Sequence, residues 1–146
     1  MSSESTLTVA ANKAAILEYC AAIDTLQSTG PLDALAAPSY VSHFPGMPPM
    51  DRDATKQYGD AFYAACPGLR HSVDEVVADG DVVAVRLTAR GTHTQPFGPI
   101  QPAGRSFELP LVNWYRLKDG KLVEQRVSFD SMGFLQQIGA MPAPGQ

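Results

Sequence analysis

Hydrophobic residues in the first half of the chain are spaced as they are in helices. Apolar residues recur at steps of three and four over residues 12–28, which predicts an amphipathic helix that a Gly-Pro pair ends. The same spacing over residues 52–65 predicts a second long helix. Between them we expect a short helix at 32–37, closed by Pro38, and an extended piece at 40–44. The apolar stripe of the first helix consists of Ala15, Ile16, Tyr19, Cys20, Ile23 and Leu26.

The second half of the chain alternates apolar and polar residues with the period of strands. Asp-Gly pairs at 79–80 and 119–120 predict hairpin turns, residues 94–105 predict a long loop, and residues 131–138 a last short helix. Helices followed by an antiparallel meander indicate an α+β domain with the helices packed on one face of a curved sheet. The four predicted strands are residues 69–78, 82–93, 106–118 and 121–130.

The length of 146 residues fits one domain. Hydrophobic residues make up 45% of the chain and charged residues 18%, so a chain of this size can bury a core without a disulfide or a metal. We expect a single domain, residues 1–146, with its core at about 12–142 and loose termini. Cys20 and Cys66 lie in predicted helices, so buried thiols are expected, and a bridge between them is the alternative.

Charge and hydropathy argue against several classes of partner. Eleven basic against fifteen acidic residues give a net charge of −4 without any run of Lys and Arg, which disfavours binding to nucleic acid or anionic membranes. The first nine residues are polar and lack the apolar core of a signal peptide. No apolar run approaches the roughly 20 residues that span a bilayer. We therefore expect a cytoplasmic protein with a small-molecule partner.

Counting back from the turn at 119–120 assigns residues to the two faces of the last hairpin. Asn113 is expected opposite Arg126 and Tyr115 opposite Glu124, on one mixed face. Either this face meets solvent, or it lines a pocket while the apolar face is covered by another subunit. The mixed face also holds Leu109, Leu111, Leu117, Ser128 and Asp130, whose leucines favour the pocket, and the opposite face holds Val112, Trp114, Val127 and Phe129.

The first hairpin predicts that His71 points inward. Its apolar faces match best with a three-residue loop at 79–81. That register places His71 on the same face as Val73, Val77, Val83, Val85 and Leu87.

Two charged side chains on the last strand are candidates for chemistry, each with a structural alternative. Asp130 stands where the strand ends and a helix begins, so it either stabilises the helix N-terminus, by roughly 0.3–1 kcal/mol, or serves as a general base at the end of the pocket. Arg126 either pairs with Glu124 or binds a carboxylate or enolate oxygen of a substrate. Asn113, opposite Arg126, could donate to the same oxygen.

Other candidate side chains are aromatic. His43, His71 and His93 lack the spacing of a metal site, and His43 and His71 are expected as polar groups of the pocket. Tyr58 and Phe62 are expected in the core or in the pocket wall. The chain contains no phosphate-binding loop, zinc-protease motif or serine-hydrolase motif, which argues against nucleotide and triad chemistry.

Six short stretches together carry a family resemblance: residues 43–45, 80–86, 91–94, 102–105, 119–124 and 130–139. In order and spacing they resemble the SnoaL-like polyketide cyclases (ester cyclases) of the NTF2-like superfamily, over about residues 12–142. The resemblance implies a cone-shaped, curved antiparallel sheet with helices on its concave face enclosing a pocket. It also implies a homodimer through the outer face of the sheet, a reaction without metal or cofactor, and an acid/base role for Asp130.

The resemblance suggests an intramolecular aldol condensation or isomerisation of a carbonyl compound, with a polyketide-like substrate. Asp130 would be the base, and His43, His71, Asn113 or Arg126 would stabilise the enolate. An epoxide hydrolase in which Asp130 activates water is one alternative, and a non-catalytic binding protein is another. Where the family most often reads Glu-His-Trp, this chain has Glu124-Gln125-Arg126, so an anionic or smaller, oxygen-rich substrate is expected instead of a flat polycyclic one.

Overall fold

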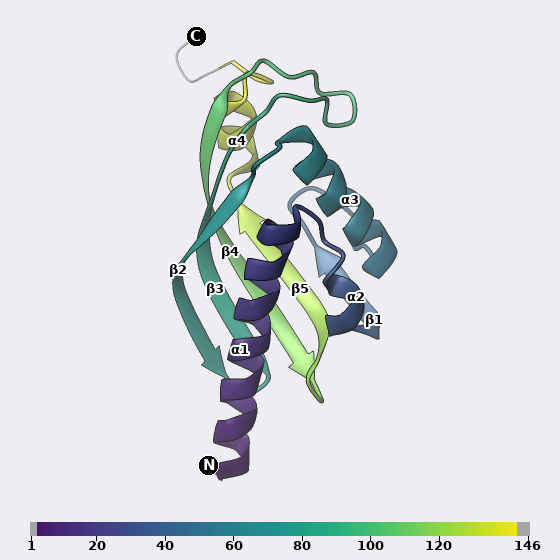
Figure 1. The fold of residues 1–146 in the computed structure, drawn as a ribbon, viewed down its shortest axis with the longest axis vertical. Coiled ribbons are helices and arrows are strands. Elements are labelled where there is room, and N and C mark those ends of the chain that lie inside the picture. The colour runs from purple at the N-terminus through teal and green to yellow at the C-terminus, as the bar shows by residue number, and fades with distance from the viewer. Residues whose placement is uncertain (1–2, 143–146) are drawn as a thin grey trace.

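A five-stranded sheet curves around the helices in this computed structural model (Figure 1). The structure describes residues 3–142, with side chains from residue 8 onward, so the prediction of loose termini falls partly outside the described residues. In chain order the elements are α1 (Ser3–Leu26), α2 (Leu32–Leu35), β1 (Ala36–His43), α3 (Arg52–Ala65), β2 (Arg70–Asp79), β3 (Val82–Thr92), β4 (Ser106–Lys118), β5 (Lys121–Phe129) and α4 (Ser131–Gln137).

The strands lie in the order β1-β5-β4-β3-β2. The meander from β2 to β5 is antiparallel, as the sequence predicts, and β1 adds a fifth strand that runs parallel to β5. Pro38 lies within β1 instead of ending a helix, which is possible because β1 is an edge strand. Helices α1 and α3 cover one face of the sheet (Figure 1), so the predicted α+β arrangement is confirmed.

A β-bulge at Val123 changes the register of the last hairpin. Lys118 pairs with Lys121 across the two-residue turn as predicted, but Arg116 pairs with Glu124, so β5 carries one extra residue. Beyond the bulge Asn113 faces Val127 instead of Arg126. One extra residue moves every later side chain of a strand to the other face. The prediction for the faces of β5 is therefore wrong, whereas that for β4 is correct.

A second bulge, at Asp74, corrects the register of the first hairpin. The turn has two residues instead of three, so Val77 faces outward and is 60% exposed. The bulge then restores the predicted pairing of Val73 with Leu87 and brings His71 opposite Ala89. His71 therefore lies on the concave face, as expected, although the loop length was predicted incorrectly.

Two groups of buried side chains form the core, one at each end of the concave face. The first packs α1 against the turn-proximal parts of the sheet, around Ile16, Val83 and Leu122. The second joins α3, α4 and the far ends of the strands, around Tyr63 and Phe134. Cys20 belongs to the first group and Cys66 to the second, and both thiols are free, so the bridge is not formed.

Helix α3 is held close to the segment that follows α1. The carboxylate of Asp60 accepts hydrogen bonds from the backbone N–H and the hydroxyl of Thr29, both at 2.7 Å. A Cβ added to Gly59 would lie 2.4 Å from Cγ2 of Thr29, so only glycine fits this contact. The contact fixes α3 over the sheet. Within the described part of the chain, no helix is long and apolar enough to cross a membrane.

Candidate functional site

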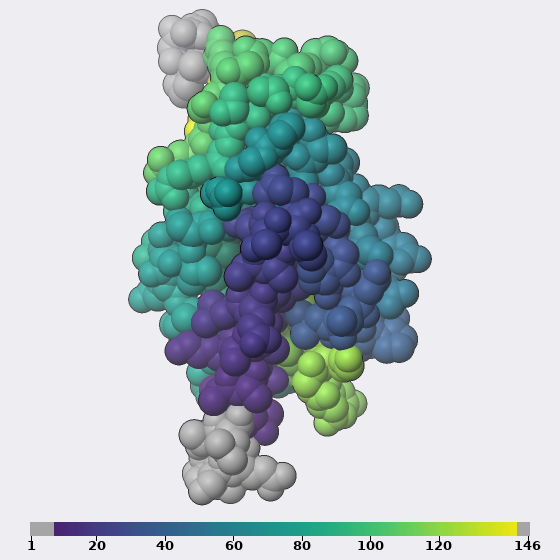
Figure 2. All heavy atoms as spheres, viewed as in Figure 1, coloured from purple at the N-terminus to yellow at the C-terminus, as the bar shows by residue number. Residues whose placement is uncertain are grey.

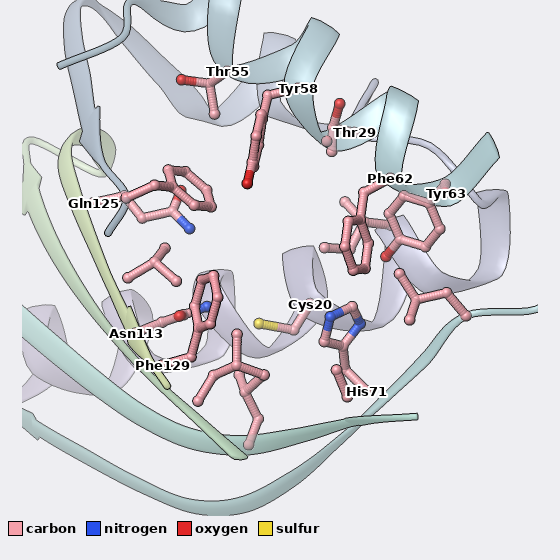
Figure 3. Close-up of a pocket in the computed structure, with 18 of the residues that line it drawn as sticks. Cys20, Thr29, Thr55, Tyr58, Phe62, Tyr63, His71, Asn113, Gln125 and Phe129 are labelled. Atoms are coloured by element: carbon pink, nitrogen blue, oxygen red, sulfur yellow. The ribbon is translucent and has the colours of Figure 1, made fainter. Parts of the chain in front are cut away.

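A cavity of about 140 Å³ lies between the helices and the concave face of the sheet (Figure 3). In the space-filling view, α1 and α3 lie over this face, and the tip of the β4–β5 hairpin projects beside the lower part of α1 (Figure 2). The wall is mostly aromatic and aliphatic. Its polar members come from α1, the segment after it, α3 and the sheet: Tyr19, Cys20, Thr29, Thr55, Tyr58, Tyr63, His71, Asn113, Tyr115 and Gln125.

His71 is the one histidine in the described lining of the cavity, and a carboxylate on α1 holds it in place. Its Nδ1 lies 2.7 Å from Oδ1 of Asp24, and its backbone N–H donates to Oδ2 of Asp24 at 2.5 Å. Tyr63 donates a third hydrogen bond to Asp24, at 2.7 Å. Both side chains of this pair are largely buried: 20% of the His71 side chain and 12% of the Asp24 side chain are exposed.

The hydrogen bonds to Asp24 determine which nitrogen of His71 is free. Burial alone would raise the pKa of Asp24, but the hydrogen bonds from the His71 ring, the Tyr63 hydroxyl and the His71 backbone outweigh it and lower this pKa below its usual value. Asp24 is therefore an acceptor at neutral pH, and Nδ1 of His71 must carry the proton. The lone pair of the neutral ring is then on Nε2, the ring nitrogen that Figure 3 shows turned away from Tyr63.

The thiol and phenol groups of the cavity stay protonated at neutral pH. Burial raises the pKa of Cys20 to about 11, although the hydrogen bond with Tyr115 partly opposes this. Burial likewise raises the pKa of Tyr58 and places that of Tyr115 well above its usual value. A protonated thiol is a weak nucleophile. Among the described lining residues, His71 is accordingly the group suited to accept a proton.

The opposite side of the cavity carries two amide side chains on neighbouring strands, Asn113 on β4 and Gln125 on β5. The hydroxyl of Tyr40 donates to Oε1 of Gln125 at 2.8 Å, which leaves the Gln125 amide nitrogen toward the cavity (Figure 3). Nδ2 of Asn113 donates to the Tyr115 hydroxyl at 3.0 Å. Oδ1 of Asn113 is buried and has no hydrogen-bond partner among the described residues.

Asp130 does not line the cavity, so the expectation that it lies at the end of the pocket is wrong. It is exposed and forms the N-cap of α4, where its Oδ1 accepts a hydrogen bond from the backbone N–H of Gly133 at 2.9 Å. The physical reason is the bulge at Val123, which turns Phe129 inward and the next residue outward. The helix-capping alternative for Asp130 is the one that the structure shows.

Arg126 and His43 also lie outside the cavity lining. Arg126 is on the outer face, 57% exposed, and its guanidinium is 3.4 Å from Glu124, so it forms the pair that was one of its two alternatives. His43 is the last residue of β1, and its Nε2 lies 3.8 Å from the same Glu124 carboxylate. No Asp, Glu, Lys or Arg belongs to the described lining, so the expectation of an anionic substrate, which rested on Arg126, loses its basis.

The remaining predicted residues do border the cavity. Tyr58 and Phe62 project from α3, and Asn113 projects from β4 on the face predicted for it. Tyr58 and Phe62 each pack edge-on against Phe97, with ring centroids 5.7 and 5.5 Å apart. The long loop predicted at 94–105, which contains Phe97, therefore contacts the aromatic side of the wall.

Sequence reasoning missed Asp24 and Gln125. Asp24 lies four residues after Cys20, on the apolar stripe of the first helix, and an isolated carboxylate on such a stripe is a signal for a buried partner. Gln125 occupies the middle of the Glu124-Gln125-Arg126 stretch that departs from the family pattern, but the predicted register placed it outside. Among the described residues, no group of three or more His, Cys, Asp or Glu side chains is placed to hold a metal ion.

Comparison with known proteins identifies the family. The family model for SnoaL-like polyketide cyclases matches residues 14–138, so the chain belongs to this family, and the predicted NTF2-like fold is confirmed. No protein of curated function matches the chain in sequence.

Three solved structures illustrate the likeness. AclR from Streptomyces galilaeus is 26% identical, with a TM-score of 0.83 over 94% of this chain and 87% of its own. A SnoaL-like protein from Jannaschia sp. CCS1 is 22% identical, with a TM-score of 0.81 over 91% and 94%. IdmH from Streptomyces antibioticus is 32% identical, with a TM-score of 0.68 over 84% and 96%.

Proposed function

We propose that this protein is an acid/base enzyme of the cyclase or isomerase kind, in which His71 removes a proton from a carbon next to a carbonyl group. The observation that carries the proposal is the hydrogen bond between Asp24 and Nδ1 of His71, which leaves Nε2 as the free base beside an apolar cavity. A base positioned in this way contributes about 10²- to 10⁴-fold to the rate. The family to which the chain belongs supports the same reaction class.

In the proposed step, the carbon–hydrogen bond breaks as a new bond forms between the proton and Nε2 of His71. The electron pair moves onto the carbonyl oxygen and gives an enolate, while the imidazole becomes an imidazolium beside the Asp24 carboxylate. That carboxylate stabilises the cation and fixes the ring, as the aspartate does in a Ser-His-Asp triad. Isomerisation follows if His71 returns the proton to another carbon, and aldol closure follows if the enolate attacks a second carbonyl.

The negative oxygen of the enolate needs donors in the same cavity. Gln125 offers its amide nitrogen, and Tyr58, whose raised pKa keeps it protonated, offers a hydroxyl. Donors fixed in a site of low polarity stabilise a developing charge more strongly than water does. Asn113 stays a proposed binding residue, whereas His43 and Arg126 are too far outside the lining to share this role.

Two other assignments compete with this one. The family resemblance gives the acid/base role to Asp130, and an epoxide hydrolase would use Asp130 and Arg126 on water and substrate. Both side chains lie outside the described cavity lining, which favours His71. The solved epoxide hydrolase of the LEH-like type from M. tuberculosis, 15% identical with a TM-score of 0.69, is a likeness of fold alone. A non-catalytic binding protein would have the same cavity without turnover.

Isomerisation of cyclohex-3-enone to its conjugated isomer tests the proposal, because the substrate is small and the product absorbs in the ultraviolet. We expect the unmodified protein to accelerate the reaction, and His71→Gln to lower kcat at least 100-fold. Asp130→Asn should retain most of the rate. A loss confined to Asp130→Asn would favour the family assignment, and binding without turnover would favour the non-catalytic alternative.

We also propose that the protein is a homodimer through the outer face of the sheet. Val112 and Trp114 on β4 are 46% and 42% exposed, and Val77 on β2, two strands away in the same sheet, is also exposed. Val127 and Phe129, which were predicted to share this surface, line the cavity instead. An apolar patch on a sheet is a common subunit contact. The cytoplasmic location stays a prediction.

A further inference from the structure

The two sides of the cavity carry different polar groups. His71 borders one side, whereas Asn113 and Gln125 border another, and apolar residues of the sheet separate the two. Gln125 is 7% exposed, so it is a buried polar side chain that belongs to the cavity and not to the surface. The reaction proposed above requires one donor for an enolate, but it does not require two amides.

The two amides leave one donor and one acceptor without partners. The hydroxyl of Tyr40 donates to Oε1 of Gln125, and the amide nitrogen of Gln125, which faces the cavity in Figure 3, donates to no described residue. Tyr115 occupies Nδ2 of Asn113, and Oδ1 of Asn113 is buried without one. Buried polar groups are nearly always paired, because an unpaired one costs about 1–3 kcal/mol. Both side chains line the cavity, so a molecule bound there can supply these partners.

The register of the sheet brings these two groups close to one another. Tyr115 pairs directly with Gln125 across β4 and β5, and Asn113 lies two residues from Tyr115 on the same face. Diagonal neighbours of this kind lie about 7–8 Å apart at the Cα atoms, and their side chains can reach the same ligand group. A ligand that pairs both amides must present an acceptor to Gln125 and a donor to Asn113, next to each other.

Size and charge restrict the ligand further. The cavity of about 140 Å³ is close to the roughly 150 Å³ that holds one benzene molecule, and below the usual range for drug-sized ligands. No Lys or Arg belongs to the described lining, and the Asp24 carboxylate lies directly behind His71. An anionic ligand would lose its hydration without gaining a fixed counter-ion, so the lining favours an uncharged one.

We propose that Asn113 and Gln125 form a specificity site for a small, uncharged ligand with at most one ring, which carries a hydrogen-bond acceptor and a donor side by side. The enol form of a 1,3-dicarbonyl compound has this pattern. Gln125 donates to its carbonyl oxygen and Asn113 accepts from its hydroxyl group. The assignment of this ligand as the substrate rests on the proposed function, but its binding does not.

Calorimetric titration with three probes of similar shape tests the site: benzamide, benzoate and toluene. Benzamide offers both a donor and an acceptor, benzoate is an anion without a donor, and toluene has neither. In the unmodified protein we expect benzamide to bind at least tenfold more tightly than benzoate. Equal or tighter binding of benzoate would overturn the proposal, and this comparison does not depend on the folding of any variant.

Two variants test whether the amide side chains of Asn113 and Gln125 cause the preference for benzamide. Asn113→Leu and Gln125→Met should each weaken benzamide about tenfold, the effect of losing one hydrogen bond, and change toluene affinity less than threefold. Gln125→Met leaves the Tyr40 hydroxyl without its acceptor, so the variant is also made in a Tyr40→Phe background. Equal losses for benzamide and toluene would overturn the assignment.

The result separates this inference from the proposed function. His71→Gln protein should still prefer benzamide to benzoate, since the amides remain. If this preference holds while cyclohex-3-enone is not isomerised by the unmodified protein, the specificity site stands and the catalytic proposal fails. If isomerisation depends on His71 but benzamide is not preferred, the catalytic proposal stands and the specificity site is wrong.

Discussion

Asp24 and His71 are 47 residues apart in the chain, yet the carboxylate of Asp24 accepts hydrogen bonds from both the ring and the backbone of His71. The ring contact fixes the orientation of the imidazole, and the backbone contact fixes the start of β2 against α1. One carboxylate therefore sets both the position of the candidate base and the nitrogen on which it is protonated. This dual contact has consequences for activity and for stability.

Asp24→Asn should lower kcat in cyclohex-3-enone isomerisation at least tenfold. The amide keeps a similar shape, but it no longer stabilises an imidazolium, and it can donate to Nδ1 and so move the ring proton to Nε2. KM should change little, because Asp24 lies behind His71 and is not part of the described cavity lining. Steady-state kinetics that report kcat and KM separately check this, since a general loss of structure would move both.

Asp60→Asn is the matched control for Asp24→Asn. Asp60 is also a hydrogen-bonded carboxylate with a lowered pKa; burial would raise this pKa, but hydrogen bonds from Thr29 and Ser28 outweigh it. Its hydrogen bonds go to Ser28 and Thr29 in the segment after α1, and not to His71. Its variant should lose stability while kcat stays within about twofold. A tenfold loss of kcat in this control would show that any loosening of the helices impairs turnover.

Asp24 should also contribute to the acid sensitivity of the fold. Its pKa is lower in the folded than in the unfolded protein, so its stabilisation is present above the unfolded value of about 3.9 and is lost as the pH falls through the folded value. Urea unfolding of the unmodified protein should show a decline in stability below about pH 4. Asp24→Asn should be less stable at pH 7 and show a shallower decline, and parallel pH curves for the two proteins would contradict this.

Gly59→Ala should destabilise the protein by about 1–3 kcal/mol, because the new methyl group would overlap Cγ2 of Thr29. Alanine usually stabilises a helix relative to glycine, so the sign of the effect tests the contact. Thr29→Ser removes the overlapping methyl group and keeps the hydroxyl that bonds to Asp60. The double variant should therefore recover most of the loss in chemical denaturation.

Gly30→Ala is the control for this series. Its added Cβ would lie 3.5 Å from the Ser28 hydroxyl, which is an ordinary contact. The free energy of unfolding should change by less than about 0.5 kcal/mol, the range of neutral surface substitutions. A stable Gly59→Ala protein, or no rescue by Thr29→Ser, would show that α3 can move away from the α1–α2 segment.

Asp130→Ala should lower stability by about 1 kcal/mol, whereas Asp130→Asn should be close to neutral. Both follow from the N-cap position, because asparagine caps a helix about as well as aspartate and alanine caps poorly. Thermal unfolding of the three proteins measures the difference. Equal stability of Asp130→Ala and the unmodified protein would contradict the capping role.

Trp114→Glu should dissociate the proposed dimer. The indole lies on the outer face beside Arg126, with which it pairs across β4 and β5, and a charge there would be buried in a subunit contact. Light scattering at micromolar concentration should give about twice 15.6 kDa for the unmodified protein and 15.6 kDa for the variant. A monomeric unmodified protein would contradict the proposal.

The elements of the fold could be predicted because their signals are local. The α3 boundaries of 52–65 and the β4 boundaries of 106–118 agree with the prediction, since prolines, glycines and turn pairs mark their ends. Strand β1 was expected only in part, because its pairing with β5 joins distant segments and its proline resembles a helix end.

The faces of the strands could be predicted only up to a bulge. A bulge has no strong sequence signal. Because of the bulge at Val123, the cavity is lined by Gln125 and Phe129 and not by the predicted Arg126 and Asp130. His71 was placed correctly because the bulge at Asp74 cancelled the error in the turn. Asp24 was missed because its partner comes from another element, and such contacts do not appear in a local pattern.

The protonation of the His71 ring tests the central claim most directly. Long-range ¹H–¹⁵N NMR spectra of the unmodified protein distinguish the two nitrogens of each neutral imidazole. We expect Nδ1 of His71 to be protonated and Nε2 to be free, with the Nε2 resonance shifting when cyclohex-3-enone is added. A ring with its proton on Nε2, or an Nε2 resonance that does not shift when the ketone is added, would contradict the assignment of His71 as the base of the cavity.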